Sequence, residues 1–206
     1  MRKLLIVLSV VLGIVFILGI SACSTYNGLI NKQQAVDSSW AQVQTVYQRR
    51  ADLIPNLVQA VSGAANFEKS TLTAVTDARA SVGKVTIDAN NAPAEAAKLE
   101  EYQRAQGQLT SALSHLLSIV ENYPNLKSNQ SFLEFQAQLE GTENRISVER
   151  GRFNAAVQDY NASIKRFPGV LFAGPMGFSA KPYFTATTEA QSAPAVHFDF
   201  GTPPAK

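Results

Sequence analysis

The chain is poor in the residue types that most often carry chemistry. Its 206 residues include one cysteine, Cys23, and two histidines, His115 and His197. A single cysteine excludes an intrachain disulfide and a metal site built from several cysteines. Neither histidine follows a glutamate by three residues, the spacing that carboxylate-bridged metal sites use in helical bundles. The sequence therefore predicts no metal site, with His115 either on a helix surface or as a capped residue of the core, and His197 in solvent.

An excess of charge of one sign is also missing. The formal net charge is +2, and Arg2 and Lys3 account for it, which leaves 16 basic and 16 acidic residues in the rest of the chain. Binding to nucleic acid needs a clustered basic surplus, so no nucleic-acid partner is expected. The serines show no nucleophile-elbow pattern, and the glycines are too dispersed to hold a phosphate. We therefore predict no catalytic residues, no cofactor and no enzyme activity.

Charged side chains are absent from Leu4 to Asn31, and Leu4–Ile20 is apolar apart from Ser9 and two glycines. Seventeen helical residues are about 26 Å long, close to the hydrocarbon thickness of about 30 Å. The chain offers no equally apolar partner that could bury such a helix. Residues 1–22 are therefore predicted to enter a membrane, which makes membrane lipid a partner.

Two kinds of anchor fit this segment. An uncleaved helix would span the membrane once, and Arg2 and Lys3 would hold the N-terminus in the cytoplasm with the body outside it. Alternatively, Ile20-Ser21-Ala22-Cys23 resembles a bacterial lipobox, in which cleavage before Cys23 leaves a lipid on its thiol. Both alternatives place the body on the same side of the membrane.

Residues 23–167 carry the apolar spacing of long helices. One helix is expected over Tyr26–Ala64, with a kink or short break near Asp52–Pro55, because proline lacks an amide hydrogen. A second helix is expected over Phe67–Val82. A third is expected from Pro93, which suits a first helical turn, to Asn122.

The fourth predicted helix, Ser131–Arg166, has the clearest pattern. Ser131 and Glu134 fit a capping box at its start. Its apolar seam alternates spacings of three and four: Phe132, Phe135, Leu139, Thr142, Ile146, Glu149, Phe153, Ala156, Tyr160 and Ile164. At about 1.5 Å per residue this helix is about 54 Å long. Long helices joined by short connections predict an all-α, elongated antiparallel bundle.

Charged residues crowd the middle of this fourth helix. They are typical of a solvated face with weak ion pairs, such as Glu149 with Arg152. A sharper hypothesis gives Glu143, Arg145 and Glu149 either a binding partner or a buried polar contact with one of three residues on the first helix: Arg49, Arg50 or Asp52.

After Phe167 the composition changes. Six of the nine prolines and four of the twelve glycines lie in residues 168–206. We expect an extended tail in which Gly169–Phe184 lies against the bundle, with the last twenty residues or so mobile. The aromatic residues of this segment are candidates for docking a partner, and a strap that covers the bundle is the alternative: Phe172, Phe178, Tyr183 and Phe184.

Three stretches together resemble the LemA family of bacterial membrane proteins. They are RRADLIPNLV at Arg49–Val58, QLEGTENRISVER at Gln138–Arg150, and FNAAVQDYNASIKRFPGVLFAGPMGFSAKPYF at Phe153–Phe184. The YNGL that begins at Tyr26 fits the same pattern. The resemblance implies a helical-bundle domain held at a membrane and implies no enzyme activity. An uncleaved anchor is the commoner arrangement in the family, so the lipobox context of Cys23 is a departure.

The sequence leaves three functions to compare. A membrane-anchored interaction or scaffold module of the bacterial envelope, with an envelope protein as partner, fits a rod-like bundle of balanced charge best. An envelope enzyme whose site is assembled only by tertiary packing is the alternative. Carriage of a small ligand or lipid would need an apolar cavity, whereas the seam is predicted to be filled by aromatic side chains.

Overall fold

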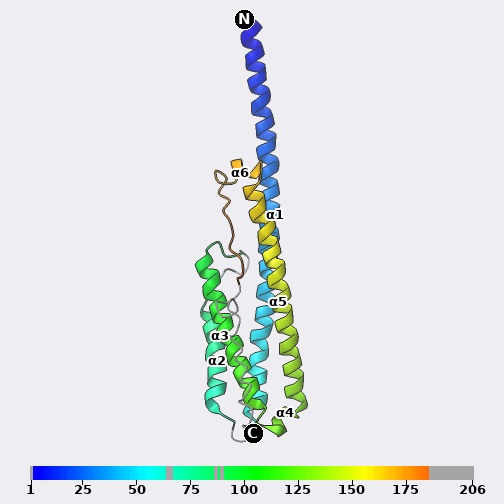
Figure 1. Cartoon of the computed structure of the whole chain (residues 1–206), viewed down its shortest axis with the longest axis vertical. Coiled ribbons are helices and arrows are strands. Elements are labelled where there is room, and N and C mark those ends of the chain that lie inside the picture. Colours follow the sequence, from blue (N-terminus) through cyan, green and yellow to red (C-terminus); the bar gives the residue numbers. More distant parts are fainter. Residues whose placement is uncertain (1, 64–66, 86–87, 89–90, 186–206) are drawn as a thin grey trace, which may run out of the picture.

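The computed structural model describes residues 2–63, 67–85, 88 and 91–185, and its regular elements there are all helices (Figure 1). The predicted all-α class is confirmed. The elements in chain order are α1 (Arg2–Ser62), α2 (Lys69–Lys84), α3 (Ala96–Val120), α4 (Pro124–Lys127), α5 (Gln130–Lys165) and α6 (Gly169–Phe172).

Two pairs of helices build the elongated bundle. The lower part of α1 packs along α5, α2 packs on α3, and α2 also contacts α1. Figure 1 shows that the first third of α1 projects alone beyond one end of the bundle. This projecting part is apolar and exposed, and it is long and apolar enough to cross a membrane. The expected boundary at residue 22 therefore falls inside a single helix.

The bundle core consists of two clusters of buried side chains. We call the cluster nearer the apolar segment the proximal cluster: Val36, Trp40, Val43, Tyr47, Ala92, Leu99, Tyr102, Ile146, Phe153, Val157, Tyr160 and Phe184. The other is the distal cluster: Ile54, Leu57, Val61, Val75, Leu109, Leu113, Leu116, Val120, Leu126, Phe132 and Leu139. The predicted seam of α5 supplies buried or partly buried residues to both clusters.

Of the two alternatives expected near Asp52–Pro55, a kink or a short break, the break is wrong, because α1 remains helical through Pro55. Proline has no amide hydrogen, so the carbonyl of Ala51, four residues earlier, lacks its usual helical partner. The Arg79 side chain on α2 replaces it, since its Nε donates to Ala51 O at 2.9 Å. A neighbouring helix thus satisfies the carbonyl that Pro55 leaves free.

Helix ends differ from the sequence predictions in three places. Pro93 lies before α3, which begins at Ala96. The segment after Tyr123 forms the one-turn helix α4, with its proline in the first turn. The side chain of Asn129, and not Ser131, caps α5 by accepting from Phe132 N at 3.3 Å. The cap lies two residues earlier than predicted, so Ser131 falls inside the first turn of the helix.

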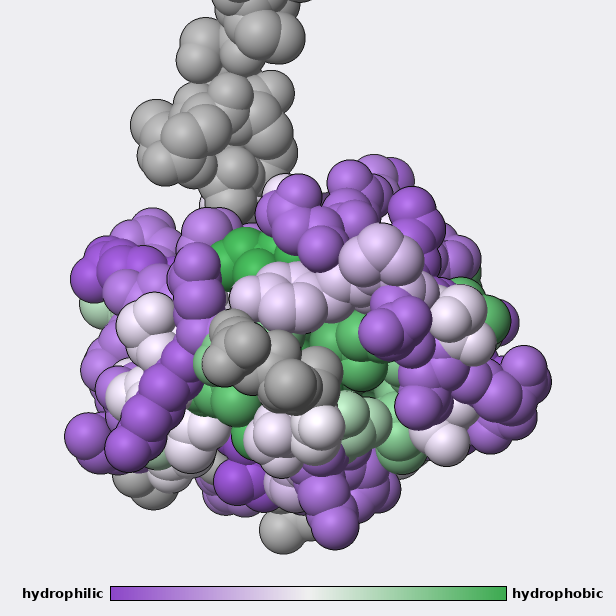
Figure 2. Space-filling view, turned by 90° about the horizontal axis from the view of Figure 1, so that it is seen from below, coloured by the Kyte–Doolittle hydropathy of each residue, from purple (hydrophilic) through white to green (hydrophobic). Residues whose placement is uncertain are grey.

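Figure 2 views the bundle from the end opposite the apolar segment. Hydrophilic side chains form most of the rim, and hydrophobic side chains are visible towards the middle, between the ends of the helices. At this end Phe67 and Tyr123 place their ring centroids 5.2 Å apart, and Leu126 of α4 is buried. The single turn of α4 therefore helps to close the distal cluster.

The prediction that the segment after α5 is extended is wrong for its first part. Residues Gly169–Phe172 form α6, and turns follow as far as Gly177, whose φ of 81° favours glycine. Gly169 is required by close packing, because a Cβ there would lie 2.1 Å from Ser163 O. Residues 178–185 then run back along the bundle without regular structure. The tail beyond 185, expected to be mobile, lies outside the described residues.

Candidate functional site

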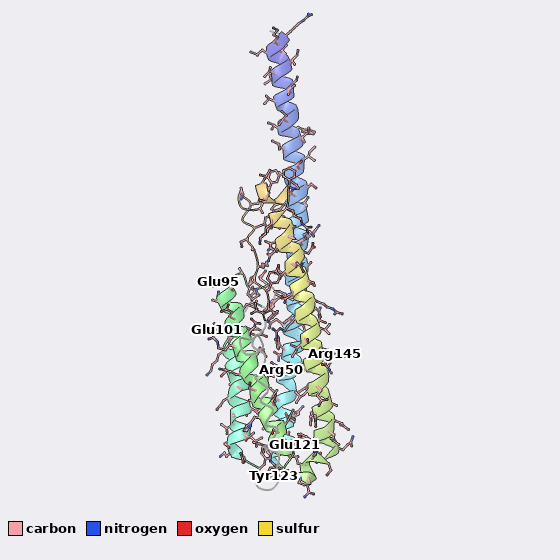
Figure 3. All side chains as sticks on the ribbon, in the orientation of Figure 1. Arg50, Glu95, Glu101, Glu121, Tyr123 and Arg145 are labelled. Atoms are coloured by element: carbon pink, nitrogen blue, oxygen red, sulfur yellow. The ribbon has the colours of Figure 1, made fainter. Side chains whose placement is uncertain are left out.

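A buried arginine links three helices in the body of the bundle. Arg50 on α1 is 2% exposed and is labelled in Figure 3. Its Nη1 donates to Glu143 Oε2 on α5 at 2.8 Å and to Thr110 Oγ1 on α3 at 2.9 Å. Its Nη2 donates to the backbone oxygen of Gln106 at 3.4 Å and also to the side-chain oxygen of that residue. The hypothesis of a contact between Glu143 and Arg49–Asp52 is confirmed.

We call Arg50 and its partners Gln106, Thr110 and Glu143 the polar layer. It separates the two core clusters. Along α1, Arg50 falls between Tyr47 of the proximal cluster and Ile54 of the distal cluster. The guanidinium also lies over the ring of Tyr47, 5.2 Å from its centroid. A buried cation costs free energy unless it is paired, so one alignment of the helices satisfies it best. The layer therefore fixes the register of α1, α3 and α5 along the bundle axis.

Two tyrosines beside Arg50 share this environment. The rings of Tyr47 and Tyr102 meet edge to face at 5.4 Å, and Tyr102 OH donates to Gln44 Oε1 at 3.3 Å. Burial raises the pKa of both hydroxyls, and the positive charges of Arg150 and Arg50 partly oppose this for Tyr47. Hydroxyls that hold their protons so firmly are poor general bases at neutral pH.

The surface beside this layer is a groove of about 750 Å³ that is open to solvent. Seven residues of α1 and one of α5 line it: Ala41, Gln44, Thr45, Gln48, Arg49, Asp52, Leu53 and Gln138. Its charged lining is one arginine and one aspartate, and Gln48 Nε2 already donates to Asp52 Oδ1 at 2.7 Å. This lining does not assemble a nucleophile with a base, as a hydrolytic site would require.

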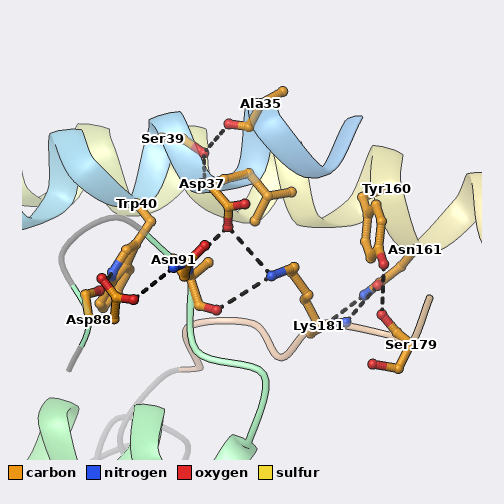
Figure 4. Close-up of polar contacts among 12 residues, drawn as sticks. Ala35, Asp37, Ser39, Trp40, Asp88, Asn91, Tyr160, Asn161, Ser179 and Lys181 are labelled. Atoms are coloured by element: carbon orange, nitrogen blue, oxygen red, sulfur yellow. Dashed lines mark hydrogen bonds and ion pairs between the residues drawn. The ribbon is translucent and has the colours of Figure 1, made fainter. Parts of the chain in front are cut away.

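A second buried ion pair ties the chain together near the proximal cluster (Figure 4). Lys181 Nζ lies 3.5 Å from Asp37 Oδ1, and both side chains are largely buried. Asp37 Oδ1 also accepts from Ala92 N at 2.9 Å, and Lys181 Nζ donates to Ala92 O at 3.4 Å. Next to them, Trp40 Nε1 donates to Asp88 O at 3.0 Å. The pair therefore joins α1, the α2–α3 loop and the segment after α6.

Two asparagines of α5 hold that segment by its backbone. Asn161 accepts from Lys181 N at 2.9 Å and donates to Lys181 O at 2.8 Å. Asn154 makes the same pair of bonds with the backbone of Phe184, both at 2.9 Å. Each side-chain amide thus forms two hydrogen bonds with the backbone N–H and C=O of one residue, the pattern by which a neighbouring β-strand pairs. We call residues 178–185 the strap, because they lie fastened along α5.

The predicted docking residues have different surroundings. Phe184 is 5% exposed and packs in the proximal cluster, with Arg150 over its ring, so it belongs to the core. Phe178 is half-buried and meets Tyr26 of α1 edge to face at 5.7 Å. Phe172 is half-buried on α6, and Tyr183 is 41% exposed on the strap. Of the four, Tyr183 offers the most open surface.

The other singled-out residues lie apart from these contacts. Cys23 is exposed on α1 where the projecting part meets the bundle, and its lipidation stays a prediction. Glu149 pairs with Arg152 at 2.8 Å, as expected from their spacing. His115 is exposed on α3, whereas His197 lies outside the described residues. In the described part of the chain, no three His, Cys, Asp or Glu side chains are grouped as a metal site would need.

Sequence reasoning missed the polar residues that fasten the strap. Asp37 and Lys181 are 144 positions apart, and neither belongs to an apolar stripe. The available signal was the pair Asn154 and Asn161, seven residues apart and therefore on one face of α5. Asparagine side chains beside the apolar seam suggest hydrogen bonds to the backbone of another segment, but they do not identify that segment.

Comparison with known proteins identifies the family of the chain. A profile of the LemA family matches residues 39–198, which include the polar layer and the strap. The chain belongs to the LemA family.

Individual LemA relatives are distant in sequence. The chain is 25% identical over 178 residues to the magnetosome protein MamQ of Magnetospirillum gryphiswaldense, covering 77% of this chain and 64% of that protein. It is also 25% identical to MamQ 2 of Paramagnetospirillum magneticum, covering 87% of this chain and 71% of the relative. Protein LemA of Metamycoplasma hominis is 23% identical, with 68% and 60% covered. The chain thus spans just under two thirds of the first relative's length.

Family membership and the exposed apolar helix together support a membrane location for this LemA protein.

Proposed function

We propose that this LemA-family protein is a non-enzymatic scaffold of the bacterial envelope, a rod that holds a protein partner at a fixed distance from the membrane. The observation that carries the proposal is α1, which runs without interruption from the apolar segment into the core of the bundle. A junction inside one helix has no loop that could act as a hinge. The rod and its anchor therefore move as one body.

The interior of the rod favours a mechanical over a chemical role. The proximal cluster is filled by aromatic rings in mutual contact, with centroids 5.3 to 6.0 Å apart between Trp40, Tyr102, Phe153 and Phe184. The buried charges of Arg50, Asp37 and Lys181 are engaged with neighbouring helices or the strap. Charges already committed to protein partners stabilise an architecture and are poorly placed to bind substrate.

The topology we propose follows from the two charges before the apolar segment. Arg2 and Lys3 favour a cytoplasmic N-terminus, which would place the bundle outside the cytoplasm. Attachment through a lipid on Cys23 is the alternative anchor, and it would leave the bundle on the same side.

A photo-crosslinking amino acid at Tyr183 would test the scaffold proposal in native membranes. Tyr183 is the most exposed of the candidate docking residues, and Ser111, exposed on α3, is a matched control position on another helix. We expect a discrete crosslinked band from position 183 and none of that mass from position 111. Equal, diffuse crosslinking at both positions would contradict a dedicated docking surface.

A further inference from the structure

The turn that joins α5 to α6 exposes apolar side chains at the end of the bundle nearest the projecting helix. Phe167 is 79% exposed, Val170 55% and Leu171 57%. Figure 1 shows α6 at the level where α1 leaves the bundle. We call Phe167–Phe172 the cap. Three large apolar side chains so close in sequence and so exposed are unusual on a surface that faces only water.

The position of the cap along α1 can be measured. Phe178, just after the cap, contacts Tyr26, and Tyr26 is six residues beyond Ile20, the end of the apolar stretch. Six helical residues rise about 9 Å. The headgroup layer adds about 5 to 8 Å to each side of the hydrocarbon, and interfacial helices sink about 5 to 10 Å into it. The contact at Tyr26 therefore places the cap close to the outer edge of the headgroup layer, within reach of side chains that point towards the hydrocarbon.

The cap is also held firmly to the bundle. Val170 N donates to Arg166 O, at the end of α5, at 2.9 Å. Gly169 is buried against the last turn of α5, where Ser163 O leaves no room for a Cβ. Because α5 packs along α1, the cap cannot move away from the membrane without taking the bundle with it.

The charges beside the cap suit the same surroundings. Lys165 and Arg166 immediately precede Phe167, and both are exposed. Basic residues next to apolar ones are typical of segments that rest on a surface of anionic headgroups. The combination favours lipid over a protein partner, because α1 already holds the cap beside a bilayer.

We propose that the cap inserts its apolar side chains into the interface of the membrane that holds α1, as a second lipid contact besides the anchor. This inference rests on the membrane location of α1 and does not depend on the kind of anchor, because Cys23 lies only three residues before Tyr26. With an uncleaved anchor, two contacts on one rigid body set the tilt of the rod, whereas a single helix leaves tilt free.

Spin labels on the full-length chain test the proposal. In a Cys23→Ser background, single cysteines at Leu171, Val11 and Ser128 receive a nitroxide, and the protein is reconstituted in vesicles of phosphatidylethanolamine and phosphatidylglycerol. Val11 lies in the apolar segment, and Ser128 is exposed beside α4 at the distal end. We expect the Leu171 label to be relaxed by oxygen more than by a water-soluble nickel chelate, as at Val11, with the opposite preference at Ser128.

Each other result overturns the proposal in a distinguishable way. A Leu171 label that behaves like Ser128, with Val11 in lipid, refutes the cap contact but leaves the membrane location intact. A Val11 label in water refutes the membrane location itself. Shielding of Leu171 from both reagents indicates a protein contact, such as a second copy. In Gly169→Ala, which must displace the cap, the preference of the Leu171 label for oxygen should fall at least twofold.

Discussion

The contact between Arg79 and the carbonyl of Ala51 explains how α1 tolerates Pro55, and it gives the sharpest prediction. Arg79→Met keeps an apolar stem of similar reach but removes the donor that lies 2.9 Å from Ala51 O. Leaving a buried carbonyl unpaired costs about 1 to 3 kcal/mol. Both residues are only half-buried, so we expect the lower part of that range, about 1 to 2 kcal/mol of unfolding free energy.

A second substitution isolates the cause. Pro55→Ala restores an amide hydrogen that can donate to Ala51 O within the helix. In that background Arg79→Met should cost less than about 0.5 kcal/mol, so the double-mutant cycle should show a coupling of about 1 kcal/mol. Urea unfolding of the full chain in detergent, followed by the fluorescence of the buried Trp40, measures all four variants.

An equal loss from Arg79→Met in both backgrounds would refute the reasoning, because Arg79 would then act through packing or charge and not through the carbonyl. Arg104→Met serves as the matched control. Arg104 is exposed on α3, so its replacement removes the same charge without a buried acceptor. It should change the unfolding free energy by less than about 0.5 kcal/mol.

The remaining predictions concern the polar layer and the strap. Glu143→Gln removes the carboxylate that pairs with the buried Arg50, and because Glu143 is 51% exposed we expect a loss of about 1 to 2 kcal/mol in urea unfolding. Asn161→Ala removes two bonds to the strap, so amide exchange there should accelerate at least tenfold while the interior of α5 keeps its protection; unchanged exchange would contradict the fastening. Burial raises the pKa of Tyr47 and Tyr102 above the value of about 10 in the unfolded chain. Their contribution to stability is therefore complete below pH 10 and is lost as pH rises through the folded pKa. An unfolding free energy that stays flat from pH 9 to 12 would contradict this pH dependence.

The fold class and α5 could be predicted because they rest on periodicity. The seam of α5 repeats over about ten turns, and such long stripes of apolar residues leave little choice of secondary structure. The pairing of Arg50 with Glu143 was also within reach, because a charge on the buried face of one long helix needs a partner on the next. Local pattern alone supports the first inference, whereas the second also needs the two long helices to be neighbours.

The strap and the continuous α1 could not be predicted, because both depend on residues that are distant in sequence. Pro55 predicts a break unless Arg79, 24 residues later, supplies a donor. As an aromatic residue in a segment rich in proline and glycine, Phe184 fits a docking role in the sequence. Only its contact with Trp40 shows that it fills the core. Exposed and buried aromatics have the same sequence pattern in a segment without regular structure, so the strap and docking hypotheses could not be separated.

The polar layer and the strap have a common consequence for a rod at a membrane. Apolar cores tolerate sliding between helices when one apolar side chain can replace another, whereas buried charges and amides fit one register only. Arg50 fixes α1 against α3 and α5, and Asp37 with Lys181 fixes α1 against the strap. The helix α5 is 36 residues long, about 54 Å. A slip of one helical turn between α5 and its neighbours would move the distal end by about 5 Å. In the scaffold role that we propose, these polar contacts at several levels would keep the far end of the rod at a constant height.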